Sequence, residues 1–319
     1  MLPLFLKKLF FLFLLSFVSI YACSYMVDAG LRKSRNAYFA NWNDLYNSKI
    51  NADLLIMGSS RAEFHISPKI LDSLLTLNSY NLGLSAWHFD MQYARFRMYL
   101  QHNKKPKYII HNVDLYGFSK REDVADAPQF LPYIHDTILQ NVTYKHKGNF
   151  NAYHQNVPLF KYKNYQKIAF EGFFTFAGFA NLFDTTSKFK GYRGNNYAWN
   201  KDFESFKKRF PKGAKYKFDK EVVRQFNEYL AFCQKENIKV ILVYAPEYFE
   251  VQPYYKNKSE LIKLCQESIK KYGCKFLDYS KNSLCFEQKY FYNSQHLNRR
   301  GAELFSVDLG KKIKPILRN

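Results

Sequence analysis

Two short segments far apart in the chain carry residue types that suit nucleophilic catalysis. Ser60 stands in Gly58–Arg61, directly after the apolar run Asp53–Met57. A strand that ends in Gly-Ser-Ser can present a hydroxyl beside the N–H groups of a following helix, which stabilise an oxyanion. A serine hydroxyl is a weak nucleophile at neutral pH and needs a base, and His296 is the candidate. Together they predict a serine esterase or acyltransferase.

Both residues also have ordinary interpretations. Gly-Ser-Ser is a common turn, and Ser59 competes with Ser60 as the exposed hydroxyl. A lone histidine is more often structural or exposed than catalytic. The position of His296 after the last expected strand favours catalysis, because that loop returns to the edge of the sheet where Ser60 is expected.

The elements that must position these residues alternate between strands and helices. The expected strands are Asp53–Met57, Ser79–Leu82, Tyr108–Val113, Ile238–Tyr244 and Lys275–Leu277. The expected helices are Pro68–Leu75, Asp90–His102, Lys220–Lys235, Lys258–Tyr272 and Arg299–Lys312. Apolar runs of strand length between helical patterns predict an α/β fold, a doubly wound, flavodoxin-like parallel sheet of five strands.

One long stretch interrupts the alternation. Residues from about 120 to 215 are rich in aromatic side chains, lysine and tyrosine and have no clear period. We interpret them as a partly helical insertion after the third strand. Loops at the carboxyl ends of strands border the ligand site in such sheets, so the insertion could be a lid or substrate platform. A packing subdomain without ligand contact is the alternative.

The first 30 residues form a separate membrane anchor or signal segment, which leaves residues 31–319 for the α/β domain. Leu9–Met26 contains eighteen residues without a charge, just enough to span a bilayer. A cleaved signal peptide has a shorter apolar region and a small-residue cleavage site, so an uncleaved anchor is favoured. A short tail left inside the cell then puts the main domain outside the cytoplasm, in the periplasm or at the bacterial cell surface.

Net charge and cysteine content say little about binding partners or about disulfides. The 319 residues carry a formal net charge of +21, which favours anionic surroundings such as phospholipid head groups, acidic glycans or nucleic acid. A general lysine bias is the ordinary explanation, and no nucleic-acid motif is present, so nucleic acid is not an expected partner. Cys23 lies in the apolar segment. The other four cysteines could form up to two disulfides or remain buried thiols, and their spacing indicates no metal site: Cys233, Cys265, Cys274 and Cys285.

The chain resembles the SGNH, or GDSL-like, hydrolase superfamily, and most of all its membrane-anchored cell-envelope branch related to alginate O-acetylation and teichoic-acid D-alanylation proteins. The resemblance covers about 30–118 and 220–315. It rests on five short segments: Gly58–Ser60, Tyr80–Gly83, Lys105–Lys107, His296–Asn298 and Gly301–Ala302.

The resemblance implies roles for individual residues. Ser60 matches the nucleophile, Gly83 the glycine whose backbone N–H serves the oxyanion hole, and His296 the base. Asn112 is the nearest match to the asparagine that completes the hole, although the usual Gly-x-Asn-Asp is absent. Arg61 could bind an anionic glycan or pair with a nearby acid, and a solvent-facing helix start is its ordinary interpretation. No metal or organic cofactor is implied.

The family usually has Asp-x-x-His at the base, whereas this chain has Asn293 three residues before His296. An aspartate would hold the imidazole tautomer and stabilise the imidazolium. Three alternatives follow. Asn293 could orient the ring in a Ser–His–Asn triad, another carboxylate such as Asp278 or Asp114 could serve, or turnover could be lost.

These expectations lead to two hypotheses about function. The first is an extracytoplasmic serine esterase or O-acyltransferase that acts on acyl, most simply acetyl, esters of a cell-envelope polysaccharide. Its partners would be the acylated glycan and a membrane-bound acyl-donor protein. The second is a catalytically impaired relative that binds a glycan or scaffolds a complex.

Overall fold

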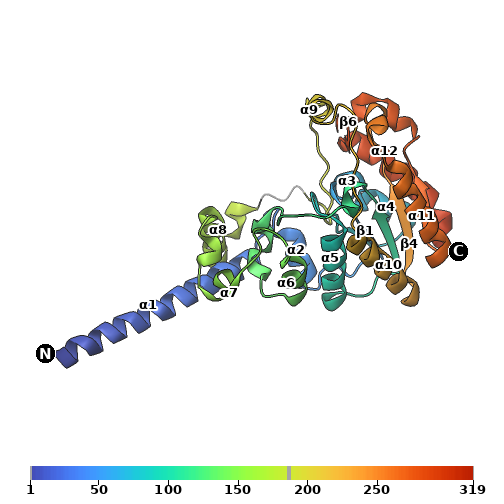
Figure 1. Cartoon of the computed structure of the whole chain (residues 1–319). Helices are drawn as coiled ribbons and strands as arrows, with labels where there is room; N and C mark the ends of the chain where they lie inside the picture. Colours follow the sequence, from blue (N-terminus) through green and yellow to red (C-terminus); the bar gives the residue numbers. More distant parts are fainter. Residues whose placement is uncertain (1, 185–187, 319) are drawn as a thin grey trace. The chain divides into compact units, whose positions relative to one another are not determined.

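The computed structural model describes residues 2–184 and 188–318, which separate into two compact units. A sheet unit contains residues 48–121 and the described residues from 188 onward, and a helical unit contains the described residues up to 47 and 122–184. Figure 1 labels the elements of both. The stretch expected as one insertion, 120–215, is therefore divided, because its second part packs with the sheet.

The sheet unit is built on five parallel strands in the order β2-β1-β3-β4-β5. They are β1 (Leu54–Met57), β2 (Ser79–Asn81), β3 (Tyr108–Asn112), β4 (Lys239–Tyr244) and β5 (Lys275–Asp278). A separate antiparallel pair follows, β6 (Phe291–Asn293) and β7 (His296–Leu297). The predicted α/β fold with a doubly wound, five-stranded parallel sheet is confirmed, and each strand lies within about two residues of its expected bounds.

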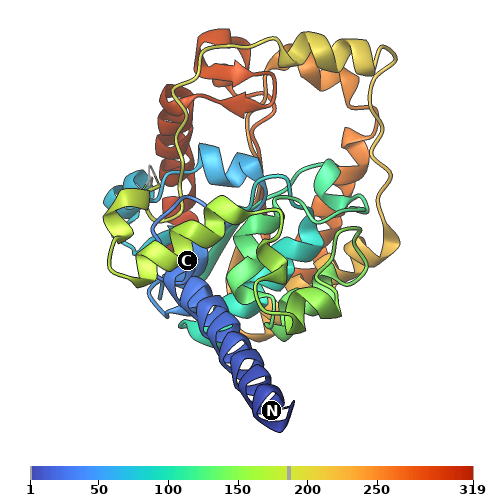
Figure 2. The same ribbon diagram turned by 90° about the vertical axis from the view of Figure 1, so that its left-hand side faces the viewer.

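Helices cover both faces of this sheet, as Figure 2 also shows from a second direction. The α-helices are α3 (Ser60–His65), α4 (Pro68–Leu75), α5 (Phe89–His102), α9 (Asp202–Arg209), α10 (Lys220–Lys235), α11 (Lys258–Tyr272) and α12 (Arg299–Arg318). Short 3₁₀ turns are η1 (Tyr116–Phe118), η5 (Phe249–Tyr254), η6 (Ser283–Phe286) and η7 (Gln288–Tyr290).

Strand alternation divides the core between the two faces. Leu54 and Ile56 belong to the core cluster that includes residues of α3, α4 and α12, such as Phe305. On the other face, the Tyr229 hydroxyl of α10 contacts the Met57 sulfur at 3.9 Å. Because successive side chains of a strand point to opposite faces, both faces of β1 are buried and its sequence is apolar throughout.

Helix ends explain why several bounds were predictable. The Asp219 carboxylate accepts the N–H groups of the first turn of α10, and Gly273 ends α11 with a left-handed φ of 68°. α12 continues past the expected end at Lys312. Pro315 removes one donor from this helix, but Ile313 and Leu317 are buried and hold the last turns against the sheet unit.

The helical unit consists of α1 (Leu2–Leu31) and shorter elements packed on its second half. These are α2 (Ala40–Tyr46), η2 (Ala127–Tyr133), α6 (Thr137–Thr143), α7 (Ala152–Asn156), η3 (Phe160–Tyr162), α8 (Gln166–Phe176) and η4 (Ala180–Phe183). Within the described part of the chain, α1 is the one helix long and apolar enough to cross a membrane.

Candidate active site

Ser60 lies at the carboxyl end of β1, as the first residue of α3. The chain turns there at Gly58, whose φ of 134° is accessible mainly to glycine, and a Cβ would lie 2.7 Å from the Asn112 carbonyl oxygen. Ser59 is fully buried and donates its hydroxyl to Asp114. This contact resolves the competition between the two serines, because it leaves Ser60 as the hydroxyl that faces the site.

The structure brings Ser60 and His296 together. Ser60 Oγ lies 2.8 Å from His296 Nε2, which is hydrogen-bonding distance. On the other side of the ring, His296 Nδ1 lies 3.0 Å from Asn293 Oδ1. An amide oxygen can only accept, so Nδ1 carries the proton and Nε2 is free to accept the Ser60 proton. This is the tautomer that a general base requires.

Asn293 is itself fixed by the turn between β6 and β7. Its Oδ1 also accepts the backbone N–H groups of Gln295 at 3.0 Å and of His296 at 2.9 Å. Its Nδ2 donates to Asp202 Oδ2 at 3.2 Å. Asp202 is the carboxylate behind the asparagine, and it does not contact the imidazole. Asp202 could not be predicted from the sequence, because α9 lies in a stretch without a clear period.

The alternative acids lie elsewhere. Asp278 ends β5, where its Oδ1 accepts the Ser280 backbone N–H at 2.9 Å. Asp114 is occupied by Ser59 and by Arg61. His296 Nδ1 therefore faces the amide of Asn293 and neither of these carboxylates.

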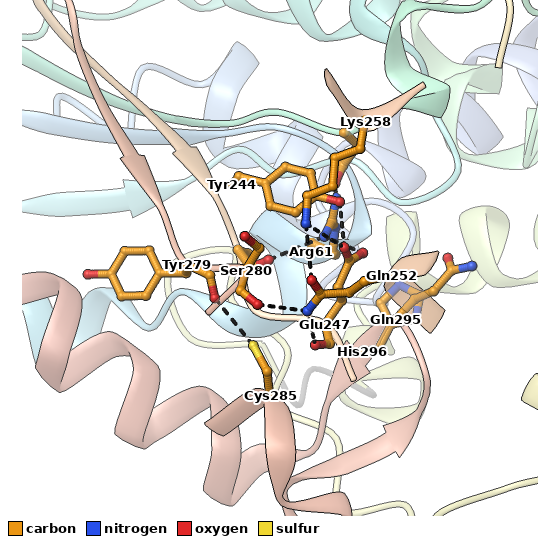
Figure 3. A network of polar contacts seen from close by, with 12 residues as sticks. Arg61, Tyr244, Glu247, Gln252, Lys258, Tyr279, Ser280, Cys285, Gln295 and His296 are labelled. Carbon is orange, nitrogen blue, oxygen red and sulfur yellow. Dashed lines mark hydrogen bonds and ion pairs between the residues drawn. The ribbon is translucent and has the colours of Figure 1, made fainter. Parts of the chain in front are cut away.

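Arg61 belongs to a buried network of charges beneath the site, drawn in Figure 3. It is 5% exposed and pairs with Asp114 and, at 3.3 Å, with Glu247. Glu247 also accepts from the Tyr244 hydroxyl at 2.6 Å and lies 3.6 Å from the Lys258 ammonium. The guanidinium that could have bound substrate is thus paired with acids inside the protein. The expectation of a solvent-facing helix start is wrong, because Arg61 is buried.

The two candidates for the oxyanion hole have other partners in the structure. The Gly83 N–H donates to Asn81 Oδ1 at 2.8 Å, and a Cβ on Gly83 would lie 2.4 Å from the Glu63 nitrogen. Gly83 thus packs directly beneath α3. Asn112 Nδ2 lies 3.1 Å from Asp114 Oδ2, and its Oδ1 accepts the Ala245 N–H at 3.3 Å. Both groups support the carboxyl edge of the sheet.

Tyr116 is a site residue that the sequence analysis missed. Its hydroxyl lies near Ser59 and Ser60, and burial raises its pKa well above the usual range. With Ser60, Arg61 and His296 it lines a small cavity of about 20 Å³, which is room for about one water-sized group. The only sequence signal was its place shortly after β3, at the same edge as Ser60.

His65, at the end of α3, holds the segment that carries His296 against the helix that carries Ser60. Its Nε2 accepts the Leu297 backbone N–H at 3.0 Å, so the residue after His296 is tied to the end of α3. Burial first, and the neighbouring His296 and Arg61 next, lower the pKa of His65 well below its usual value. Because a neutral ring is needed to accept this bond, the depressed pKa keeps the attachment intact at acidic pH.

Burial also determines the protonation of the base. The pKa of His296 is lowered from 6.5 to about 3, chiefly by burial and secondarily by the positive charge of Arg61, while Asp202 acts in the opposite direction. His296 is therefore neutral across the physiological range. Among the described residues, no group of three or more His, Cys, Asp or Glu side chains could hold a metal ion. All five cysteines are free thiols.

No known protein family matches this sequence. No curated protein matches it either. Solved structures similar to this chain include three at 12% identity. The first is described as an acylhydrolase from Bacteroides fragilis, with a TM-score of 0.38 over 83% of this chain and 87% of that one. The second is described as a lipolytic protein of the G-D-S-L family from Desulfitobacterium hafniense, with a TM-score of 0.40 over 81% of this chain and 97% of that one. The third is described as a GDSL-like lipase from Bacteroides thetaiotaomicron, with a TM-score of 0.36 over 83% of this chain and 87% of that one.

Proposed function

We propose that this chain is a serine-dependent ester hydrolase or O-acyltransferase of the SGNH type. The observation that supports it is the relay from Ser60 Oγ through His296 to Asn293, with contacts of 2.8 and 3.0 Å. Ser60 Oγ attacks the ester carbonyl while His296 Nε2 takes its proton. The tetrahedral intermediate collapses to an acyl-serine, and the leaving alcohol takes the proton back from His296.

The oxyanion needs donors that are directed at the carbonyl oxygen. The Ser60 backbone N–H lies in the first turn of α3, where no intrahelical acceptor exists. The Tyr116 hydroxyl, beside Ser60, is the second donor that we propose. Gly83 and Asn112 would join them only if their present hydrogen bonds were exchanged during turnover.

The small cavity beside Ser60 favours a short acyl group such as acetyl over a fatty acyl chain. We further propose that the substrate is an acylated cell-envelope polysaccharide on the outer side of the membrane, with a membrane-bound protein as acyl donor in the transferase version. The apolar helix α1 and the net charge of +21 motivate this assignment. Arrival of water or of a sugar hydroxyl at the acyl-serine decides between hydrolysis and transfer.

The test uses the full chain in detergent with p-nitrophenyl acetate and acetylated xylan as substrates. Ser60→Ala and His296→Ala should each reduce turnover, by about 10²–10⁴-fold for the base. Ser259→Ala, an exposed serine on α11, is the matched control and should match the wild type. A fluorophosphonate probe should label the wild type at Ser60 and should not label Ser60→Ala.

One observation favours a second function. His296 has an uncharged partner, so the imidazolium formed during acylation lacks a counter-ion. A glycan-binding or scaffold protein with an impaired site would show neither probe labelling at Ser60 nor ester turnover above that of Ser60→Ala. That result would replace the enzyme assignment with the binding one.

A further inference from the structure

From Phe170 onward, α8 buries its polar residues and exposes most of its apolar ones. Its buried residues are Glu171, Gly172 and Thr175. The exposed large apolar residues of α8 and of the segment after it are Phe170, Phe173, Phe176, Phe179 and Leu182, with 58%, 40%, 38%, 53% and 72% of their surface accessible. A surface helix in water normally shows the opposite arrangement. We call these five residues the aromatic face.

The orientation of this face is fixed by contact with α1, which Figure 1 shows beside α8. The two helices cross backbone to backbone, because a Cβ on Gly30 would lie 1.8 Å from the Gly172 carbonyl oxygen. Glu171 accepts from Ser34 Oγ at 2.5 Å and from Asn36 Nδ2 at 3.0 Å. With its polar side held in this way, α8 cannot turn the aromatic face inward.

The height of α8 along α1 identifies what the aromatic face meets. Other segments of the helical unit contact α1 between Tyr21 and Asp28, a zone of α1 that has polar contacts at both ends. The Tyr21 hydroxyl donates to the Asn156 carbonyl at 3.3 Å, and Asp28 pairs with Lys161 at 2.7 Å. The charge-free run of α1 ends inside this zone, at Val27, directly before Asp28. Its 19 helical residues from Leu9 span about 28 Å, close to the ~30 Å thickness of the hydrocarbon core. The zone therefore coincides with the level at which α1 leaves the hydrocarbon.

We propose that the aromatic face enters the lipid–water interface of the same membrane that α1 crosses, as a second contact with lipid. α8 has 11 residues and is about 16 Å long, too short to span a bilayer but suited to lie in its interface. Between Ile168 and Phe183 the only charge is Glu171. Exposed Lys163 and Lys167 precede this run and suit anionic head groups.

The aromatic face adjoins the apolar surface of α1, and this favours lipid over a protein as the partner that covers the face. The aromatic face belongs to the same compact unit as α1, whose residues from Leu4 to Tyr21 expose a large apolar surface. A bilayer that receives α1 reaches the aromatic face without any further partner. A second copy of the chain or the sheet unit would have to exclude lipid from a surface that adjoins the span.

The experiment places a fluorescent reporter on the aromatic face of the full chain. Phe173→Trp is reconstituted in vesicles of phosphatidylcholine and phosphatidylglycerol that carry bromine on the acyl chains near the head groups. The wild type, with Trp42, Trp87 and Trp199, supplies the background. Leu14→Trp, on exposed α1, reports whether the span is in the bilayer. We expect the lipid bromine to quench most of the added Phe173→Trp fluorescence, while aqueous iodide has little effect.

The other outcomes overturn the proposal. Quenching by iodide without quenching by bromine means that the face is in water, and protection from both means that protein covers it. A Leu14→Trp signal that bromine leaves unchanged means that α1 lies outside the bilayer. In the Phe173→Trp background, Phe170→Asp should make the reporter accessible to iodide, whereas the apolar control Phe170→Leu should not. Unchanged thermal unfolding of each variant shows that the helical unit remains folded.

Discussion

At the scale of single residues, the amide in the position of a triad carboxylate has a clear physical effect. Asn293 selects the required tautomer of His296 through one hydrogen bond, but it supplies no negative charge. Burial and the nearby Arg61 charge together lower the pKa of His296 to about 3. The base is therefore always available at neutral pH, while the imidazolium it must become is costly. An aspartate would both orient the imidazole and stabilise the imidazolium charge, whereas Asn293 only orients the ring.

Asn293→Asp tests this separation. The new carboxylate should favour the imidazolium, so the pKa of His296 should rise above about 3. Turnover at pH 8 should increase by about tenfold or more, because the charge formed in acylation gains a counter-ion. The acid limb of kcat/KM should move to higher pH. Esterase assays from pH 5 to 9 measure both effects.

Asp202→Asn is the matched control. It removes the carboxylate that accepts from Asn293 Nδ2, yet Asn293 keeps the two backbone donors that hold its Oδ1. Its rate should remain within a few-fold of the wild type. A drop as large as that of His296→Ala would show that Asp202 supplies the charge through the amide.

At the scale of elements, the site is assembled from the carboxyl ends of three strands and the β6–β7 turn. Ser60 follows β1, Tyr116 follows β3, Glu247 follows β4, and His296 begins β7. Residues at this edge converge because parallel strands end there together. α3 is the element on which this convergence depends. It is held from below by Asn81, which donates to the Ala62 and Ile66 carbonyls at 2.7 and 2.8 Å.

Gly83→Ala should disturb that support. The added methyl group would meet the Glu63 backbone nitrogen at 2.4 Å, so α3 must move and carry Ser60 away from His296. We expect a loss of about 1–3 kcal/mol in the free energy of unfolding, together with reduced turnover. Gly117→Ala is the matched control, because its Cβ would meet only Asp114 Cβ at 3.9 Å. Equal urea midpoints for the two variants would contradict the packing argument.

The elements and part of the site could be predicted because local patterns encode them. The bounds of α4, α10 and α11 follow from apolar periodicity and from end signals such as Asp219 and Gly273. Ser60, His296 and Asn293 lie at ends of predicted elements, where the topology determines their neighbours. Asp202 and Tyr116 come from irregular segments whose course depends on tertiary packing. The buried pairing of Arg61 depends on loops from two other strands.

At the scale of the whole molecule, burial of neutral histidines couples folding to pH. The pKa of His111 and that of His296 fall from 6.5 to about 3 through burial, and that of His65 falls well below its usual value. Between these folded values and 6.5, the unfolded chain binds protons that the folded chain does not. The stabilisation is complete above about pH 6.5 and is lost progressively as the pH falls toward 3.

His111→Gln should flatten this dependence. Urea unfolding of the wild type should show a free energy that falls between pH 6.5 and 4, and each such histidine contributes up to about 1.4 kcal/mol per pH unit. Because His111 faces Gln92 and Tyr229 on the side of the sheet away from Ser60, the variant removes one such group without touching the base. An unchanged slope in the variant would contradict the assignment of acid sensitivity to buried rings.

The close crossing of α1 and α8 also constrains the order of events during synthesis. Gly30 meets a backbone that lies more than a hundred residues further along the chain, and the whole sheet segment 48–121 is made in between. A contact of such long sequence separation forms late, since the intervening loop must first be closed. With α1 as the membrane span that we propose, the nascent chain delivers α1 to the bilayer with its glycine surface still unpaired. Membrane insertion then comes first, and completion of the helical unit waits until the ribosome has passed residue 176.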